Sequence, residues 1–264
     1  LPNGDSIYLN HTLQWLDDTL LFANNKETYL EVVRAFLRSM KHKGLRIGVT
    51  KMVFFAEQVT YCGRRINKDG WNFEAKFYKT IESMQRPQFV HELAQAAHLA
   101  GWLATATPDF AEIKAKFQKA YPEIQKKKTD LQRMNLIVDW TPDLTENWKR
   151  LKRELRKASA RNLQFYDTRD DILIMTDASD RHWSAIVMVC PPIRGDQLLD
   201  LQKEPGKTLR TLDVQLMLCL SGTFTASQVN WHISEKEIYP IVYLFKRQGF
   251  FVSNHPRPLK LFTD

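Results

Sequence analysis

Two adjacent carboxylates stand in a part of the chain that is otherwise apolar. Asp17 and Asp18 lie between Leu13 and the apolar run Leu20–Phe22. At a hairpin turn, two neighbouring carboxylates can point outward together and bind a hard cation. Asp is also common in exposed turns for conformational reasons alone. The position of the two residues therefore leaves both interpretations open.

Three further acids are far apart in the sequence, and each belongs to a predicted strand or helix. Asp177 ends one strand, Asp264 ends another, and Glu237 lies on a helix between them. If the two strands are neighbours in one sheet and the helix packs on it, the three carboxylates converge. Converging carboxylates repel each other unless cations neutralise them, so the set predicts ligands for Mg²⁺ or Mn²⁺. Two such ions about 4 Å apart would activate a water and stabilise the leaving oxygen in phosphodiester hydrolysis.

The elements that position Asp17 and Asp18 are predicted from hydrophobic spacing and turn residues. Over roughly residues 7–75 the pattern predicts the order β-β-α-β-β, with the first two strands joined by a short turn at Asn10-His11. The predicted strands are Ile7–Leu9, Leu13–Ala23, Arg46–Lys51 and Gln58–Ile66, and the predicted helix begins near Asn24 and ends at Gly44.

The remaining elements divide into a helical segment and a second mixed segment. Helices are predicted over Phe89–Leu103 and over Asp143–Ala158, the latter basic and amphipathic. From about Leu163 the order becomes β-β-β-α-β, which places a last strand parallel to an earlier one. The predicted strands are Ile172–Met175, Trp183–Val189, Cys219–Phe224 and Leu259–Thr263, with a helix from Ser234 to about Arg247 whose apolar stripe is Ile238, Ile241, Val242 and Phe245.

The composition is that of a globular chain with an excess of positive charge. Among 264 residues, 44% are hydrophobic, 26% are charged and the net charge is +8. Three cysteines are too few for a disulfide framework, and no apolar run approaches the length that spans a membrane. Residues 111–160 hold 13 Lys or Arg against 7 Asp or Glu. This segment is either a solvated helix face or a surface for a phosphate backbone, and charge alone does not separate the two.

Several motifs in the first half occur in a fixed order. Trp15-Leu16-Asp17-Asp18 resembles the Tyr-x-Asp-Asp signature of reverse transcriptases, with Trp in the place of Tyr. Tyr61–Ile66 followed by Gly70 resembles the primer-grip segment of those enzymes. Arg86-Pro87 with Val90–Leu93 resembles the start of the thumb in gypsy-type long-terminal-repeat retroelements.

The motifs of the second half resemble the RNase H domain of the same retroelements. The segments are Thr176–Asp180 with Trp183–Ala185, Leu220–Phe224, Asn230-Trp231 with Glu235–Glu237, and Phe262–Asp264. Together with the first half, they cover nearly the whole chain in the order and at the spacing of a gypsy-type pol polyprotein.

The resemblance implies a fold and a domain organisation. The expected class is α/β (α+β): a partial reverse-transcriptase palm over 1–75, a basic helical thumb and linker over 76–160, and an incomplete RNase H-like mixed-sheet domain over 161–264. It also implies Mg²⁺ or Mn²⁺ as cofactor. The implied partners are an RNA–DNA hybrid or another nucleic acid and the remainder of a pol polyprotein, with no membrane and an intracellular location.

The resemblance also assigns roles to residues. Asp17 and Asp18 would be polymerase metal ligands, and Asp177, Glu237 and Asp264 would be RNase H ligands. Glu235 competes with Glu237 for the helix position, and Glu237 is preferred because it starts the apolar helical stripe. The implied nucleic-acid contacts are Cys62 and Gly63 near the primer terminus, and Lys126, Lys127, Lys128, Lys149, Arg150, Lys152 and Arg153 in the thumb and linker.

The chain departs from the family pattern at both ends. Only 16 residues precede Asp17, so the strand that carries the third polymerase aspartate is not present, and the sequence stops at Asp264 before a fourth RNase H aspartate. We therefore expect this chain not to polymerise DNA. The expected parent activity is RNA-directed DNA synthesis and metal-dependent cleavage of RNA in RNA–DNA hybrids. The alternative is a catalytically inert remnant that binds nucleic acid or another partner.

Overall fold

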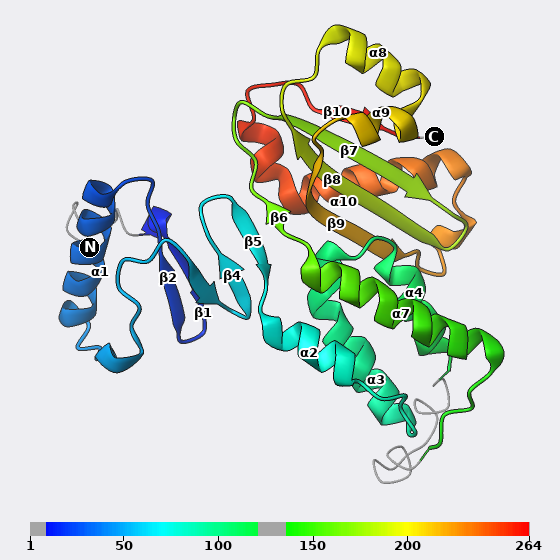
Figure 1. Ribbon diagram of the computed structural model, residues 1–264, viewed down its shortest axis with the longest axis horizontal. Helices are drawn as coiled ribbons and strands as arrows, with labels where there is room; N and C mark the ends of the chain where they lie inside the picture. Colours follow the sequence, from blue (N-terminus) through cyan, green and yellow to red (C-terminus); the bar gives the residue numbers. More distant parts are fainter. Residues whose placement is uncertain (1–8, 121–135, 264) are drawn as a thin grey trace. The chain divides into compact units, whose positions relative to one another are not determined.

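The computed structural model describes residues 9–120 and 136–263. Helices and strands occur together along the chain, as the predicted α/β class requires (Figure 1). The chain divides into two compact units, residues 1–68 and residues 69–264. Among the described helices, none is long and apolar enough to cross a lipid bilayer.

The first unit opens with a tight β-hairpin. Strand β1 (Thr12–Trp15) pairs antiparallel with β2 (Asp18–Leu21), and the turn consists of Leu16 and Asp17. Leu16 has a φ of 52°, a left-handed conformation that is uncommon for a residue with a side chain of this kind. The hairpin therefore keeps its two-residue turn against a local conformational cost.

The predicted turn at Asn10-His11 is wrong, because these residues precede the hairpin. His11 closes its open end: the backbone N–H of Phe22 donates to the His11 carbonyl at 3.0 Å. The His11 Nδ1 also lies 3.1 Å from the Phe22 carbonyl oxygen. The predicted strand at Ile7–Leu9 lies largely outside the described residues, and Leu9 itself is in a 3-10 turn.

Helix α1 (Lys26–His42) follows one residue later than the sequence predicted. Asn25, not Asn24, is the N-cap, and its Oδ1 accepts from the Thr28 N–H at 2.8 Å. The buried face of the helix packs near Leu21 of β2. That face consists of Val32, Val33, Ala35 and Ser39.

A second hairpin completes the first unit. Strands β3 (Val59–Tyr61) and β4 (Arg64–Ile66) pair antiparallel around a turn at Cys62-Gly63. Both turn residues have positive φ, 48° and 75°, as a type I′ turn requires. The predicted strand at Arg46–Lys51 is wrong, because Val49–Lys51 forms the 3-10 helix η2.

The second unit begins with a helical layer around the largest hydrophobic core of the chain. Helix α7 (Pro142–Ala160) shows how the sequence specifies it: Thr141 caps its first turn by accepting from the Leu144 N–H at 3.2 Å, and Pro142 is its first residue. Its buried residues include Leu144, Trp148, Leu151 and Leu155, so the predicted amphipathic helix is confirmed. The other elements of the layer are β5 (Gly70–Phe73), α2 (Ala75–Ser83), α3 (Val90–Ala100), η3 (Gly101–Ala106), α4 (Phe110–Lys119) and β6 (Leu163–Gln164).

A four-stranded mixed sheet forms the rest of the second unit. Its strand order is β10-β7-β8-β9, with β10 parallel to β7 and the other neighbours antiparallel. The predicted order β-β-β-α-β is confirmed, although the sequence reading missed α8 and α9. The elements are β7 (Asp171–Ala178), β8 (His182–Cys190), α8 (Gly195–Lys203), α9 (Pro205–Thr211), β9 (Gln215–Thr223), η4 (Gln228–Asn230), α10 (Ile233–Asn254) and β10 (Lys260–Phe262).

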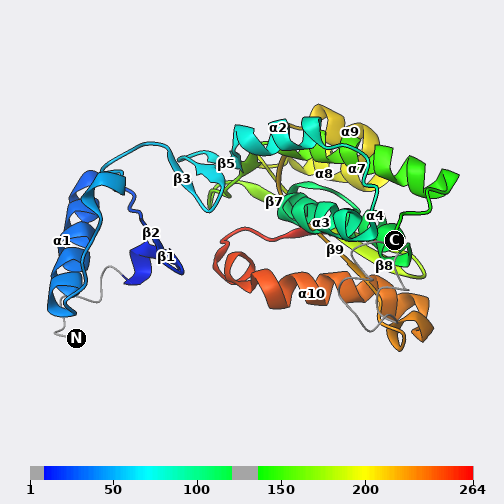
Figure 2. The same ribbon diagram turned by 90° about the horizontal axis from the view of Figure 1, so that it is seen from below.

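Helices cover both faces of this sheet (Figure 2). Successive side chains of β7 point to opposite faces. Ile172 and Ile174 belong to a cluster with Leu244 of α10, while Leu173 packs with Leu201 of α8. The central strand is therefore apolar without alternation, which is typical of a strand that is buried on both sides.

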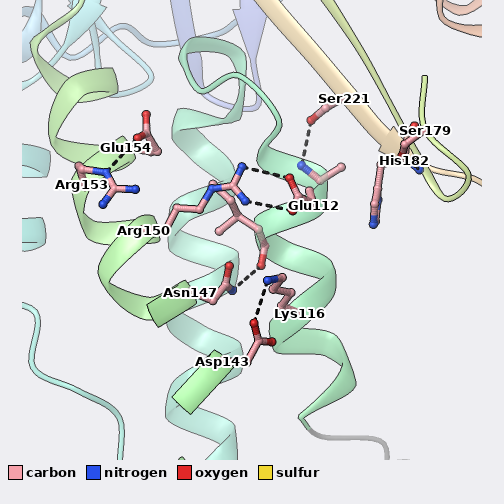
Figure 3. Close-up of polar contacts among 12 residues, drawn as sticks. Glu112, Lys116, Asp143, Asn147, Arg150, Arg153, Glu154, Ser179, His182 and Ser221 are labelled. Atoms are coloured by element: carbon pink, nitrogen blue, oxygen red, sulfur yellow. Dashed lines mark hydrogen bonds and ion pairs between the residues drawn. The ribbon is translucent and has the colours of Figure 1, made fainter. Parts of the chain in front are cut away.

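The helical layer and the sheet are joined across β9. Helix α4 and the 3-10 helix η3 pack against this strand. The Ala111 N–H at the start of α4 donates to Ser221 Oγ of β9 at 2.9 Å (Figure 3). The structure thus groups the predicted segments 76–160 and 161–264 in one compact unit.

A buried ionic cluster ties the first residue of β7 to β10. Asp171 is fully buried, and its Oδ1 lies 2.6 Å from Arg257 Nε and 2.9 Å from Lys260 Nζ. Its Oδ2 accepts from the Ile193 N–H at 2.7 Å. Burial alone would raise the pKa of this carboxyl, but the hydrogen bonds from Arg257, Ile193 and Lys260 lower the pKa to about 2. The carboxylate is thus charged and paired.

We expect Asp171→Asn to lower the free energy of unfolding by about 3 kcal/mol at pH 7. Removing one partner of a buried ionic cluster leaves the others without a counter-charge. Urea unfolding would measure the loss, with the exposed Asp213→Asn as a matched control that changes stability by less than about 0.5 kcal/mol. A loss below about 1 kcal/mol for Asp171→Asn would contradict the structural importance of the cluster.

The same cluster predicts a pH dependence. The native carboxyl keeps its charge down to about pH 2, whereas in the unfolded chain it takes up a proton near pH 3.9. The unfolded state therefore binds more protons between these values, and stability is lost as the pH falls from about 4 to 2. The difference in unfolding free energy between wild type and Asp171→Asn should shrink over this range. A difference that stays constant from pH 5 to pH 2.5 would argue against a paired native carboxylate.

Candidate metal-binding and nucleic-acid-binding sites

One sheet edge carries the first of the predicted RNase H-like acids. Asp177 is the penultimate residue of β7, and its side chain is exposed. Strand β10 runs parallel beside β7 with Phe262 opposite Met175. The two strands therefore end at the same edge. Asp264 lies outside the described residues.

Helix α10 brings the second acid toward this edge. It packs against β7 and β8, and Glu237 lies in its second turn. The Nζ of Lys236 is 3.6 Å from Oδ1 of Asp180 in the turn that follows β7. This ion pair brings the start of α10 to the end of β7. Glu237 is half-buried.

The competing helix acid has a different function in the structure. The Oε2 of Glu235 accepts from the backbone N–H of His232 at 2.9 Å, so this carboxylate caps the start of α10. It is exposed, whereas Glu237 is turned partly into the protein. Glu235 is thus engaged at the helix start, and the preference for Glu237 as the helix acid stays a prediction.

The turn between β7 and β8 is held in shape by its own polar groups (Figure 3). The Ser179 N–H donates to the His182 carbonyl at 2.8 Å, and the His182 N–H donates to Ser179 Oγ at 3.1 Å.

Within the described ranges, no group of three His, Cys, Asp or Glu side chains is arranged to hold a metal ion. The described part thus supplies two of the three predicted RNase H-like acids.

The predicted polymerase-like acids lie on the hairpin of the first unit. Asp17 is in the turn, Asp18 begins β2, and both are exposed. Burial, the Cys62 side chain and the Asp18 carboxylate together raise the pKa of the Tyr61 hydroxyl. The Asp18 charge therefore acts on the second hairpin, whose turn is Cys62-Gly63. Both motifs that resemble polymerase segments lie in this unit.

Two of the four α7 cations that were predicted to contact nucleic acid, Arg150 and Lys152, are paired with other groups of the chain. Arg150 makes two hydrogen bonds of 3.0 Å to the carboxylate of Glu112, which lower the pKa of Glu112 (Figure 3). Lys152 Nζ donates to the Met84 carbonyl at 2.8 Å. These two cations hold α7 to α4 and to the end of α2.

Two other cations of α7 are more open to solvent. Arg153 contacts its neighbour Glu154 at 3.4 Å. Lys149 is 68% exposed and lies 3.9 Å from Glu146, a weak surface pair. Lys149 is the better placed of the two for an external phosphate. The predicted contacts Lys126, Lys127 and Lys128 lie outside the described residues.

Sequence reasoning missed Asp171, Asp180 and Lys236. Asp171 and Arg257 are 86 residues apart, and no local pattern connects them. Lys236 stands in a charged run, Glu235-Lys236-Glu237, which is typical of an exposed helix start. Only the packing of α10 shows that the lysine is buried.

No family model matches the chain. It is 22% identical over 255 residues to the Transposon Tf2-3 polyprotein of Schizosaccharomyces pombe, covering 97% of this chain and 17% of that polyprotein. It is 22% identical over 244 residues to the Enzymatic polyprotein of Cauliflower mosaic virus (strain D/H), covering 90% of this chain and 32% of that protein. The chain thus spans between about a sixth and a third of these relatives.

Solved structures show the same fold at lower identity. The foamy viral protease-reverse transcriptase dRH in complex with double-stranded DNA matches with a TM-score of 0.64 and 15% identity, over 97% of this chain and 40% of that one. The foamy viral protease-reverse transcriptase in complex with an RNA/DNA hybrid matches with a TM-score of 0.62 and 15% identity, over 97% and 31% of the two chains.

Proposed function

These likenesses confirm the resemblance to retroelement pol polyproteins, and we propose that residues 69–264 bind an RNA–DNA hybrid and cleave its RNA strand. Residues 1–68 then supply the Asp17–Asp18 hairpin to RNA-directed DNA synthesis by the larger polyprotein. The relatives are much longer than this chain, so the second activity is assigned to the parent protein.

The parallel pairing of β7 with β10 supports the cleavage site most directly. Met175 and Phe262 are opposite each other. In the sequence, an aspartate follows each of these two residues by two positions. Asp177 lies on β7, and Asp264 comes after β10 in the sequence. Carboxyl ends of adjacent parallel strands meet at one edge of a sheet. Glu237 on α10 completes the proposed set.

The chemistry of these side chains suits a hard divalent cation. Carboxylate oxygens are the preferred ligands of Mg²⁺ and Mn²⁺. Asp177 is open to solvent and Glu237 is half-buried, so one can reach an incoming ion while the other is held by the protein. A bound divalent ion would activate water and stabilise the leaving oxygen at the scissile phosphate. The role of the three acids is to hold and orient that ion.

The proposed substrate is held mainly by its backbone. Proteins recognise A-like duplexes through shape, phosphate and 2′-hydroxyl contacts more than through base edges. Lys149 on the outer side of α7 offers an exposed ammonium for a phosphate. Arg150 and Lys152 support this surface from inside, by fixing α7 to its neighbours.

A second candidate function is binding of nucleic acid without cleavage. It is supported by the exposed Lys149 on α7, which can contact a phosphate without any metal ion. One assay that follows both binding and cleavage of the hybrid distinguishes the two functions. Both functions predict binding, but only the first predicts that the RNA strand is cleaved.

We expect Asp177→Asn to abolish cleavage of labelled RNA in an RNA–DNA hybrid, by at least about 10³-fold, in Mg²⁺ and in Mn²⁺. Losing one carboxylate weakens the proposed metal site, while hybrid binding through α7 stays within about twofold. Asp213→Asn, an exposed acid on the same unit, should cleave like wild type. Hybrid binding by the wild-type chain without any cleavage would support the second candidate.

We expect Lys149→Gln to weaken hybrid binding and to reduce the slope of log Kd against log salt by about 0.9, the value for one phosphate contact on duplex DNA. A fluorescence titration at several salt concentrations measures this slope. Lys203→Gln, an exposed lysine at the end of α8, is the matched control and should leave the slope unchanged. An unchanged slope for Lys149→Gln would place the phosphate-binding surface elsewhere.

A further inference from the structure

One lysine is buried at the start of α10. Lys236 is 5% exposed, and among the described residues it shares this degree of burial with just one other ionised side chain, Asp171. Burying an ammonium is costly unless a carboxylate pairs with it. Its partner is Asp180, at 3.6 Å.

Lys236 and Asp180 lie close in sequence to the two described acids of the proposed site, Glu237 and Asp177. Lys236 directly precedes Glu237 on α10, and Asp180 follows Asp177 by three residues. Asp180 is itself 93% exposed, so the pair extends from the interior to the tip of the turn. The hydrogen bonds between Ser179 and His182 fix the shape of this turn. They do not reach α10, which contacts this region through the ion pair and through the packing of Trp183 on Tyr239 and Tyr243.

We infer that Lys236 is a positioning residue, which with Asp180 clamps the turn after β7 to α10 and sets the separation between Asp177 and Glu237. This inference rests on the proposed metal site. A long side chain that is held by a carboxylate at its tip and packed along its stem connects two elements more rigidly than exposed contacts do. Groups outside the ligand set often act this way, and their loss costs about 10- to 100-fold in metal affinity.

Mn²⁺ binding to the 264-residue chain distinguishes a positioning function from simple electrostatics. Lys236→Met keeps the length of the apolar stem and removes the positive charge. If charge alone mattered, removal of a cation beside two carboxylates would strengthen Mn²⁺ binding. A positioning function predicts the opposite sign: about tenfold weaker binding by isothermal titration calorimetry.

Four further variants complete the design. Asp180→Asn should weaken Mn²⁺ binding about as much as Lys236→Met, and the double variant should lose no more than either alone, because both break the same pair. Lys236→Arg, which keeps the charge, should recover most of the affinity. Lys246→Met, an exposed lysine on the same helix, should stay within twofold of wild type. Unchanged or tighter binding by Lys236→Met, or additive losses in the double variant, would overturn the inference.

Amide hydrogen exchange separates this inference from the proposed function. Loss of the clamp should raise the exchange rates of residues 179–182 about tenfold in Lys236→Met, with β7 and Lys246→Met unchanged. Wild-type protein that fails to bind Mn²⁺ would refute the metal site, and exchange would still report whether the clamp exists. Exchange rates at residues 179–182 that equal those of wild type would refute the clamp even if Mn²⁺ binds.

Discussion

A carboxylate buried at the start of one strand determines where the last strand of the chain lies. Asp171 draws Arg257 and Lys260 to the beginning of β7, and Lys260 is the first residue of β10. The ionic contact at one end thus favours the parallel register along the rest of the strand. At the other end, the same register aligns the positions that lead to Asp177 and to the last residue of the sequence. The proposed catalytic edge therefore depends on a cluster that lies at the far end of β7.

Packing supports this arrangement on both faces of the sheet. Leu244 of α10 contacts the side of β7 that carries Ile172 and Ile174, so the helix with Glu237 runs against the strand with Asp177. On the opposite face, Leu201 of α8 covers Leu173. Because the sheet is covered on both sides, we place the proposed site at the carboxyl ends of β7 and β10 and not on a face of the sheet. The helical layer adds a basic face, fixed to the sheet by the contact between Ala111 and Ser221.

The sequence predicted those elements whose signals are local. The apolar run Ile172–Met175 correctly predicted a buried strand, and the apolar spacing within residues 143–158 correctly predicted α7. A hairpin turn at the two aspartates was one open interpretation, but the predicted strand Leu13–Ala23 ran through it, because leucine gives no signal of the left-handed conformation at Leu16.

Helix α10 shows why a candidate site is harder to predict than a fold. Its apolar spacing correctly predicted a helix, but Ile238 and Val242 are exposed while Lys236 and Leu244 are buried. The spacing of apolar residues predicts a helix, but it does not determine which face of that helix packs against the sheet. The acids themselves were selected from their positions at strand ends and on a helix, and the resemblance then assigned roles to them. The ion pairs that position them were not, because Asp171 and Arg257 are 86 residues apart.

In the proposed function, the ends of β7 and β10 and the start of α10 form one metal site. Titration of the isotopically labelled chain with small amounts of Mn²⁺, followed by amide NMR, tests it most directly, because the ion broadens the signals of nearby residues first. If these elements form one site, residues 176–178, 262–264 and 236–238 lose intensity together at the lowest Mn²⁺ concentrations. Broadening that spares this edge, or that is centred solely on the Asp17–Asp18 hairpin, would contradict it.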